Sequence, residues 1–213
     1  SRNLLTNMAE KFPNNWKIGL ILLISFILSG CSSIQNPIFT VPSQEWQQHQ
    51  SAIQMVESWQ LRGRLSIRSP EESSTISINW LQENQNFDIR LNGSLGLGSV
   101  LISGDNQQVR IEKAGEESVM LTSLQGIGLA YLGFDFPAEE LYYWIRGLPA
   151  LSTPSEIFVN EDQLLASLNQ NDWELEYDRY EEYSQLALPG RIRLHREPYT
   201  LTFLINNWEI DSP

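Results

Sequence analysis

Long stretches of the chain alternate between apolar and polar residues, which is typical of β-strands with one buried face. The clearest stretch is residues 59–68, where tryptophan, leucine, glycine and isoleucine alternate with arginine, glutamine and serine. Short polar turns separate it from further stretches of the same pattern, at residues 75–80, 87–92, 100–103, 109–112, 119–121, 174–178, 191–195 and 200–205. We therefore predict antiparallel strands joined mostly by short turns.

Two regions have a helical period instead. After Ser43, a residue suited to cap a helix, Trp46, Ile53 and Val56 recur at near-helical spacing. From residue 123 to 147 a second apolar stripe is interrupted by phenylalanines and proline, and Gly147 is expected to stop it. We predict an N-terminal helix and a pair of helices inserted in the middle of the sheet.

These elements predict a mainly β fold with α (α+β), in one domain covering residues 44–213. Some ten strands with one apolar face must curl, because large twisted sheets rarely stay open. We therefore expect an incomplete antiparallel β-barrel, a half-barrel, with the helical insertion at about 123–147 as a lid or plug. An incompletely filled concave face would bind an apolar ligand.

The first thirty residues have the layout of a secretory signal peptide. Lys11 and Lys17 precede an uncharged apolar run, residues 18–28, which is shorter than the about 20 residues of a membrane-spanning helix. Met8 is a plausible start of this leader. We expect residues 1–30 to be removed and residues 31–43, which contain two prolines, to form a tether.

The run ends in Leu28-Ser-Gly-Cys31, which resembles a bacterial lipobox. That resemblance implies cleavage before Cys31, a diacylglycerol on its thiol and an acyl group on its new amino group. Several acyl chains anchor a protein stably, whereas one chain binds only marginally. The residue after the cysteine is Ser32, and this resembles the pattern of lipoproteins that are sorted to the outer membrane. The alternatives are an uncleaved membrane anchor and a free thiol.

The net charge of −12 limits the functions that the chain can have. Nucleic-acid binding is disfavoured because it depends on Lys and Arg contacts to phosphate. The acidic balance would steer a basic protein partner, although it also serves solubility alone. With one cysteine and two histidines, no metal site, cofactor site or catalytic arrangement is evident. Adjacent glutamate pairs are best interpreted as solvated surface.

Three glycines surround two leucines in residues 93–98. Glycine permits tight turning, and a leucine in such a turn has few neighbours to pack against. Leu95 is therefore predicted to project outward, although the alternative is a turn leucine that folds back onto the sheet.

Several short motifs along the whole mature chain resemble the LolB family of outer-membrane lipoprotein receptors. They are Trp46-Gln-Gln-His49, Trp59-Gln-Leu-Arg-Gly63-Arg64, Trp80, Gly93-Ser-Leu95-Gly96, Trp144-Ile-Arg-Gly-Leu-Pro149, Leu188-Pro-Gly-Arg-Ile192 and Asn207-Trp208. The turn differs from the family's frequent Asn-Pro-Leu-Gly, because Gly93-Ser94 precedes the leucine here.

The resemblance implies a monomeric, lipid-anchored receptor on the periplasmic face of the outer membrane. It would take triacylated lipoproteins from a soluble, LolA-like periplasmic carrier and insert them among outer-membrane phospholipids, with Leu95 contacting the membrane. No bond would be made or broken. The predicted acyl-chain cavity residues are Leu65, Ile67, Ile78, Trp80, Ile89 and Leu91 on the strands, and Leu124, Tyr131, Leu132, Tyr142 and Trp144 on the lid.

Two other functions are open at this point. A structural lipoprotein of an envelope assembly machine would have the same fold with a core filled by its own side chains. A lipoprotein hydrolase would need a catalytic triad, and the sequence offers no sign of one. Uptake of a lipid-soluble fluorophore separates a cavity from a filled core.

Overall fold

The computed structural model describes residues 43–93, 98–105, 107–124, 127–128 and 134–210. All of them belong to one compact unit, Phe39–Pro213. Every member of the hydrophobic core of this unit lies between Trp46 and Ile210. The unit therefore contains the core that it needs to fold without residues 1–38.

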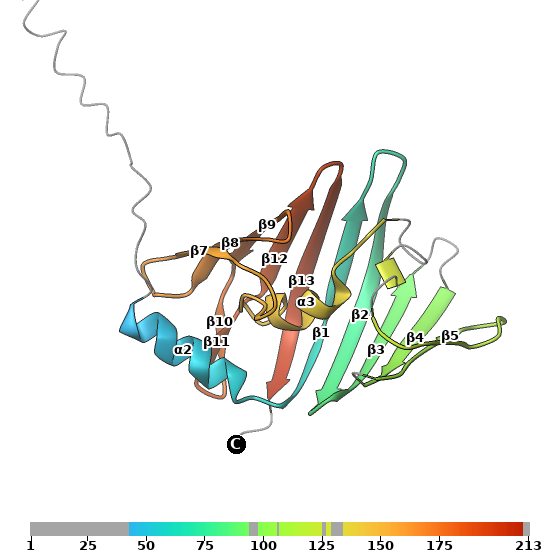
Figure 1. Cartoon of the computed structure of the whole chain (residues 1–213), viewed down its shortest axis with the longest axis horizontal. Helices are drawn as coiled ribbons and strands as arrows, with labels where there is room; N and C mark the ends of the chain where they lie inside the picture. The colour runs from blue at the N-terminus through green and yellow to red at the C-terminus, as the bar shows by residue number, and fades with distance from the viewer. Residues whose placement is uncertain (1–42, 94–97, 106, 125–126, 129–133, 211–213) are drawn as a thin grey trace, which may run out of the picture. The chain divides into compact units, whose positions relative to one another are not determined.

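The first described element is helix α2, Gln44–Gln54, where the sequence predicted a helix. Ser43 caps it, since the Ser43 side chain accepts a hydrogen bond from the Trp46 backbone nitrogen at 3.1 Å. Trp46 and Ile53 are buried and fasten the helix to the domain. In Figure 1, α2 lies beside the small hairpin of β10 and β11.

The remaining elements are mostly strands, as the alternation predicted. In chain order they are β1 (Ser58–Arg68), β2 (Ser73–Glu83), β3 (Asn86–Gly93), β4 (Gly98–Gly104), β5 (Val109–Lys113), β6 (Val119–Leu121), helix α3 (Ala138–Trp144), β7 (Glu156–Val159), β8 (Leu165–Gln170), β9 (Trp173–Asp178), β10 (Glu181–Tyr183), β11 (Leu186–Leu188), β12 (Arg191–Arg196) and β13 (Tyr199–Ile210).

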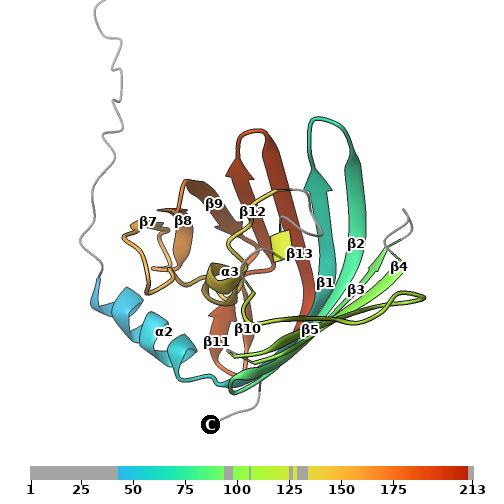
Figure 2. The ribbon, with the colours of Figure 1, turned by 45° about the vertical axis from the view of Figure 1, so that its right-hand side comes forward.

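Eleven of these strands form one antiparallel sheet in the order β6-β5-β4-β3-β2-β1-β13-β12-β9-β8-β7. The first and last strands, β1 and β13, pair with each other in the centre, so the two halves of the chain extend outward from this seam. The sheet curls but does not close, because β6 and β7 lie at opposite edges (Figures 1 and 2). The predicted half-barrel is confirmed.

Four short strands were not among the predicted ones. β7 and β8 have no clean alternation, and a bulge interrupts their pairing between Phe158 and Val159. β10 and β11 have three residues each and form a separate two-stranded sheet inserted between β9 and β12. Strands this short and irregular give too few alternating positions for a period to be recognised.

The chain passes from one edge of the sheet to the other between β6 and β7, and we call residues 122–155 the crossing segment. It contains α3, which lies in front of the middle of the sheet in both views (Figures 1 and 2). α3 is shorter than the sequence suggested, ending at Trp144, and Gly147 follows with a φ of +78°. Glycine suits this left-handed conformation because it has no Cβ.

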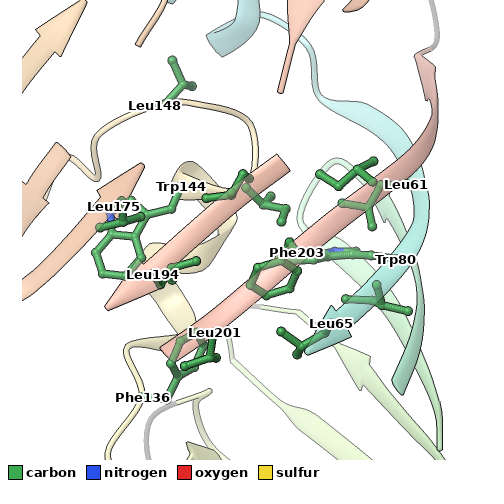
Figure 3. Packing of buried hydrophobic residues seen from close by; sticks show 14 of the residues in the cluster. Leu61, Leu65, Trp80, Phe136, Trp144, Leu148, Leu175, Leu194, Leu201 and Phe203 are labelled. Carbon is green, nitrogen blue, oxygen red and sulfur yellow. The ribbon is translucent and has the colours of Figure 1, made fainter. Parts of the chain in front are cut away.

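The seam between β1 and β13 contains Gly63, at a position where only glycine fits. The register of this pair shifts between Arg62 and Gly63. A Cβ at Gly63 would lie 2.2 Å from the backbone oxygen of Leu204, so the bulge allows no side chain there. Beyond it, Leu65 lies opposite Phe203, and Figure 3 shows the side chains of both beside that of Trp80.

Candidate functional site

An apolar cavity of about 120 Å³ lies between the curled sheet and the crossing segment. Every described residue that lines it is apolar or glycine, and none of these carries a charge. The sheet contributes Leu65, Ile76, Ile78, Trp80, Ile89, Leu91, Gly93, Val100, Ile102, Leu201 and Phe203, and the crossing segment contributes Leu124, Ile127, Phe136, Ala138 and Leu141. Such a lining can bind hydrocarbon and offers no group for chemistry.

The predicted cavity residues fall into three groups. Leu65, Ile78, Trp80, Ile89, Leu91 and Leu124 line this cavity. Ile67 packs against the core near the end of β1, Trp144 is fully buried, and Tyr142 lines an adjoining hollow. Tyr131, Leu132, Leu95 and Cys31 lie outside the described residues.

Several of the residues that line the cavity were not predicted to do so, and these fall into two cases. Ile76, Val100 and Ile102 share the apolar face of strands that were predicted, so the alternation alone could have found them. Leu201 and Phe203 join them only because β13 pairs with β1. That pairing brings together the two ends of the domain and leaves no local signal in the sequence.

A second hollow, of about 650 Å³, adjoins the cavity, and we call it the vestibule. Trp80 and Leu124 line both spaces and therefore form the partition between them. The vestibule is more polar, with Gln82, Asn84, Gln85, Asp105, Ser123, Glu139, Glu140, Tyr142 and Tyr143 in its wall together with Phe87, Ala150, Leu151 and Ser152. Among the residues that the structure describes, three carboxylates and no cationic side chain line the vestibule.

Three tryptophans of the motifs noted in the sequence, Trp59, Trp80 and Trp208, pack together at this partition. The ring centroid of Trp59 lies 5.1 Å from that of Trp80 and 5.5 Å from that of Trp208. The Trp208 indole donates to the Pro189 carbonyl at 3.2 Å, and the Trp80 indole donates to Gln82 at 3.1 Å. Residues far apart in sequence thus build one rigid corner beside the cavity.

Arg146 is buried, with 3 % of its surface exposed, and forms no ion pair with a described carboxylate. Its Nη1 donates to the carbonyls of Ile53 and Val56, both at 3.3 Å, and its guanidinium lies 4.1 Å from the Tyr142 ring centroid. A cation is favourable at the C-terminal end of a helix such as α2. Burial lowers the pKa of Arg146, but a guanidinium stays charged at neutral pH.

Gln170 fastens the crossing segment to β8 with all the hydrogen bonds that its amide can offer. Its Oε1 accepts from the Trp144 indole at 2.8 Å and from the Ala150 nitrogen at 2.9 Å. Its Nε2 donates to the carbonyls of Ala150 and Thr153, both at 2.8 Å. Gln170 therefore holds the crossing segment at Trp144, Ala150 and Thr153, and Arg146 holds it to the end of α2 between the first two of these positions.

The described residues lack two features, a metal-binding cluster and a membrane-spanning helix. They contain no group of three or more histidine, cysteine or acidic side chains placed to hold a metal ion. None of the helices described is both long and apolar enough to cross a membrane.

The open, curled antiparallel sheet is shared with solved structures. A LolA superfamily protein from Nitrosomonas europaea superimposes with a TM-score of 0.54 over 82 % of this chain and 96 % of its own, at 9 % identity. A DUF1329 family protein from Desulfovibrio piger gives a TM-score of 0.57 over 81 % and 94 %, at 10 % identity. At this identity the likeness shows the fold alone, an open and curled antiparallel sheet.

The sequence comparisons go further. Residues 57–208 match the family described as outer membrane lipoprotein LolB, and the chain belongs to that family. The outer-membrane lipoprotein LolB of Stutzerimonas stutzeri is 34 % identical over 87 % of this chain and 92 % of its own length. The resemblance noted in the sequence is confirmed, and membership places the chain among lipid-anchored proteins of the outer membrane.

Proposed function

We propose that this protein is the outer-membrane receptor that accepts triacylated lipoproteins from a soluble, LolA-like periplasmic carrier and releases them into the membrane. The apolar cavity is the observation that carries the proposal, since it is lined without a single charged side chain. Transfer needs no bond to be made or broken, so the protein acts as a binding and delivery factor and not as an enzyme.

An apolar path from carrier to membrane is required by the chemistry of the cargo. Each methylene group of an acyl chain is worth about 0.8 kcal/mol when it is buried. Three acyl chains therefore cannot cross water at a useful rate. A receptor cavity that meets the carrier and then the bilayer keeps the chains covered throughout.

The cavity must enlarge when cargo enters. An apolar cavity of about 150 Å³ in another protein binds one benzene molecule, so the 120 Å³ present here holds roughly six carbons. Backbone hydrogen bonds hold the sheet wall, whereas the crossing-segment wall around Phe136 is held through side chains. The Phe136 ring packs against that of Trp173, with centroids 5.6 Å apart, and the Asn171 side chain donates to Glu140. We infer that this crossing-segment wall moves away from the sheet as acyl chains enter.

Two further assignments complete the proposal. Cys31 carries the lipid that holds the mature chain, residues 31–213, on the periplasmic face of the outer membrane. Leu95, in the turn between β3 and β4, contacts phospholipid during release. The flanking residues Gly93 and Gly98 pair with each other where the two strands end, and Gly93 also lines the cavity, which supports release at this end.

The cavity is tested with a fluorescent fatty acid and the soluble unit, residues 39–213. We expect saturable uptake that palmitate displaces. Ala138→Phe places a ring in the cavity and should weaken the affinity at least about tenfold, since the loss of one large buried apolar contact is worth about 1.5–3 kcal/mol. Ala114→Phe, in an exposed turn, should bind as the parent does. Absence of uptake by the parent would favour a scaffold with a filled core.

A further inference from the structure

The vestibule adjoins the cavity and has the opposite chemistry. The two spaces share the side chains of Trp80 and Leu124, so a ligand that fills the cavity can continue past this partition. The vestibule's volume, about 650 Å³, far exceeds that of the cavity. A ligand with an apolar end and a polar, peptide-like continuation would match both spaces.

The polar groups of the vestibule suit a peptide. The turn residues Asn84 and Gln85 are exposed and bring amide groups to its wall, and the hydroxyls of Tyr142 and Tyr143 add donors and acceptors. Peptide groups need such partners when they leave water, because an unpaired buried amide is costly. The buried side chain of Gln82 is already satisfied by Trp80 and by the Asn84 carbonyl, so it serves the wall itself.

The charge of the vestibule adds a preference. Glu139 is exposed at its wall, and Glu140 accepts a hydrogen bond from the Asn171 amide. Asp105 accepts from the backbone nitrogens of Gln107 and Gln108, and these bonds lower its pKa, so it stays ionised. With no cationic side chain in the lining, the three carboxylates favour a positively charged ligand.

We propose that the vestibule binds the peptide segment that follows the lipid-bearing cysteine of a cargo lipoprotein, with a preference for basic segments. The acyl chains then occupy the cavity and the peptide emerges past Trp80 and Leu124. This inference rests on the proposed function. The inference adds to the proposed function a site that distinguishes one lipoprotein from another.

The position of the vestibule relative to the strand ends fits this arrangement. On the half of the sheet that holds β3 and β4, the vestibule lies at the turns containing Asn84, Gln85 and Asp105. Gly93, which lines the cavity, lies at the other end of β3. Acyl chains that start from a cysteine near the vestibule would therefore point toward the β3–β4 turn, from which release is proposed.

The test uses two synthetic lipopeptides that share a triacylated cysteine and differ in the next four residues, which include two lysines in one and two glutamates in the other. Displacement of a fluorescent fatty acid from residues 39–213 gives both affinities. We expect the lysine form to bind about three- to tenfold more tightly at low salt, and the ratio to shrink as salt is added.

The matched variants locate the preference. Glu139→Gln with Glu140→Gln should lower the affinity ratio markedly, since only Asp105 then remains charged in the described lining, and glutamine at 140 can still accept from Asn171. Glu71→Gln with Glu72→Gln, in the exposed β1–β2 turn, should keep the parent ratio. If both lipopeptides bind the parent equally, or the Glu139/Glu140 variant keeps the ratio, the vestibule inference is wrong while the receptor proposal stands. If neither lipopeptide displaces the fatty acid, both fail.

Discussion

At the scale of single residues, Arg146 shows how a buried charge can organise a fold without a carboxylate partner. Its guanidinium tolerates burial because it donates to two carbonyls at the end of α2, those of Ile53 and Val56, and to the Tyr142 carbonyl in α3. The face of the Tyr142 ring covers the remaining side. The arginine of the Trp-Ile-Arg-Gly motif therefore joins α2 to the crossing segment.

Replacing this side chain tests that role. Arg146→Met keeps the length but leaves the carbonyls of Ile53 and Val56 without their donor, so the free energy of unfolding should fall by about 1–3 kcal/mol. Arg64→Met, at an exposed position on β1, should change it by less than about 0.5 kcal/mol. Equilibrium urea unfolding measures both. Equal stability of the two variants would show that Arg146 is not an anchor.

At the scale of elements, the crossing segment divides into a fixed part and a part that faces the cavity. Trp144 and Ala150 are held by Gln170, and Arg146 is held by α2. The cavity wall, in contrast, is made by residues that precede these anchors. In the proposed function the wall yields to an acyl chain, and the anchors at Arg146 and Gln170 keep the rest of the segment attached to the domain.

Removal of one anchor should loosen the part of the crossing segment that it holds. Gln170→Leu leaves the Trp144 indole and the Ala150 nitrogen without an acceptor, so amide hydrogen exchange of residues 144–153 should become faster. Asn169→Leu, on the exposed side of the same strand, serves as the matched control. Mass spectrometry of peptides from this region distinguishes the variants. Unchanged protection in Gln170→Leu would mean that packing alone holds the segment.

The elements also show where reading the sequence succeeds and where it stops. Alternation located β1 to β5 and the half-barrel, because one wet and one buried face imprint a period of two. It did not reveal the β1–β13 seam, which brings Leu201 and Phe203 to the cavity from the far end of the chain. Nor did the alternation distinguish Trp144 from the cavity residues of α3, Ala138 and Leu141. All three are apolar positions on one short helix, but Trp144 is fully buried and donates to Gln170.

At the scale of the whole molecule, the described unit combines one apolar cavity with a polar vestibule beside it. We propose that the cavity binds the acyl chains of lipoproteins and that the vestibule distinguishes the peptides attached to them. Cys31 and Leu95, which lie outside the described residues, supply anchoring and delivery in this account. The acidic net charge of −12 gives the protein a means of attracting a basic partner.

The most direct test of the receptor proposal is transfer of a radiolabelled lipoprotein from its soluble carrier to outer-membrane vesicles. Residues 39–213 should take the lipoprotein from the carrier and deliver it to the vesicles. The Leu95→Glu variant should take the lipoprotein from the carrier but fail to deliver it to the vesicles, because a carboxylate resists insertion into hydrocarbon. If the parent unit never takes the lipoprotein from the carrier, the receptor proposal is contradicted.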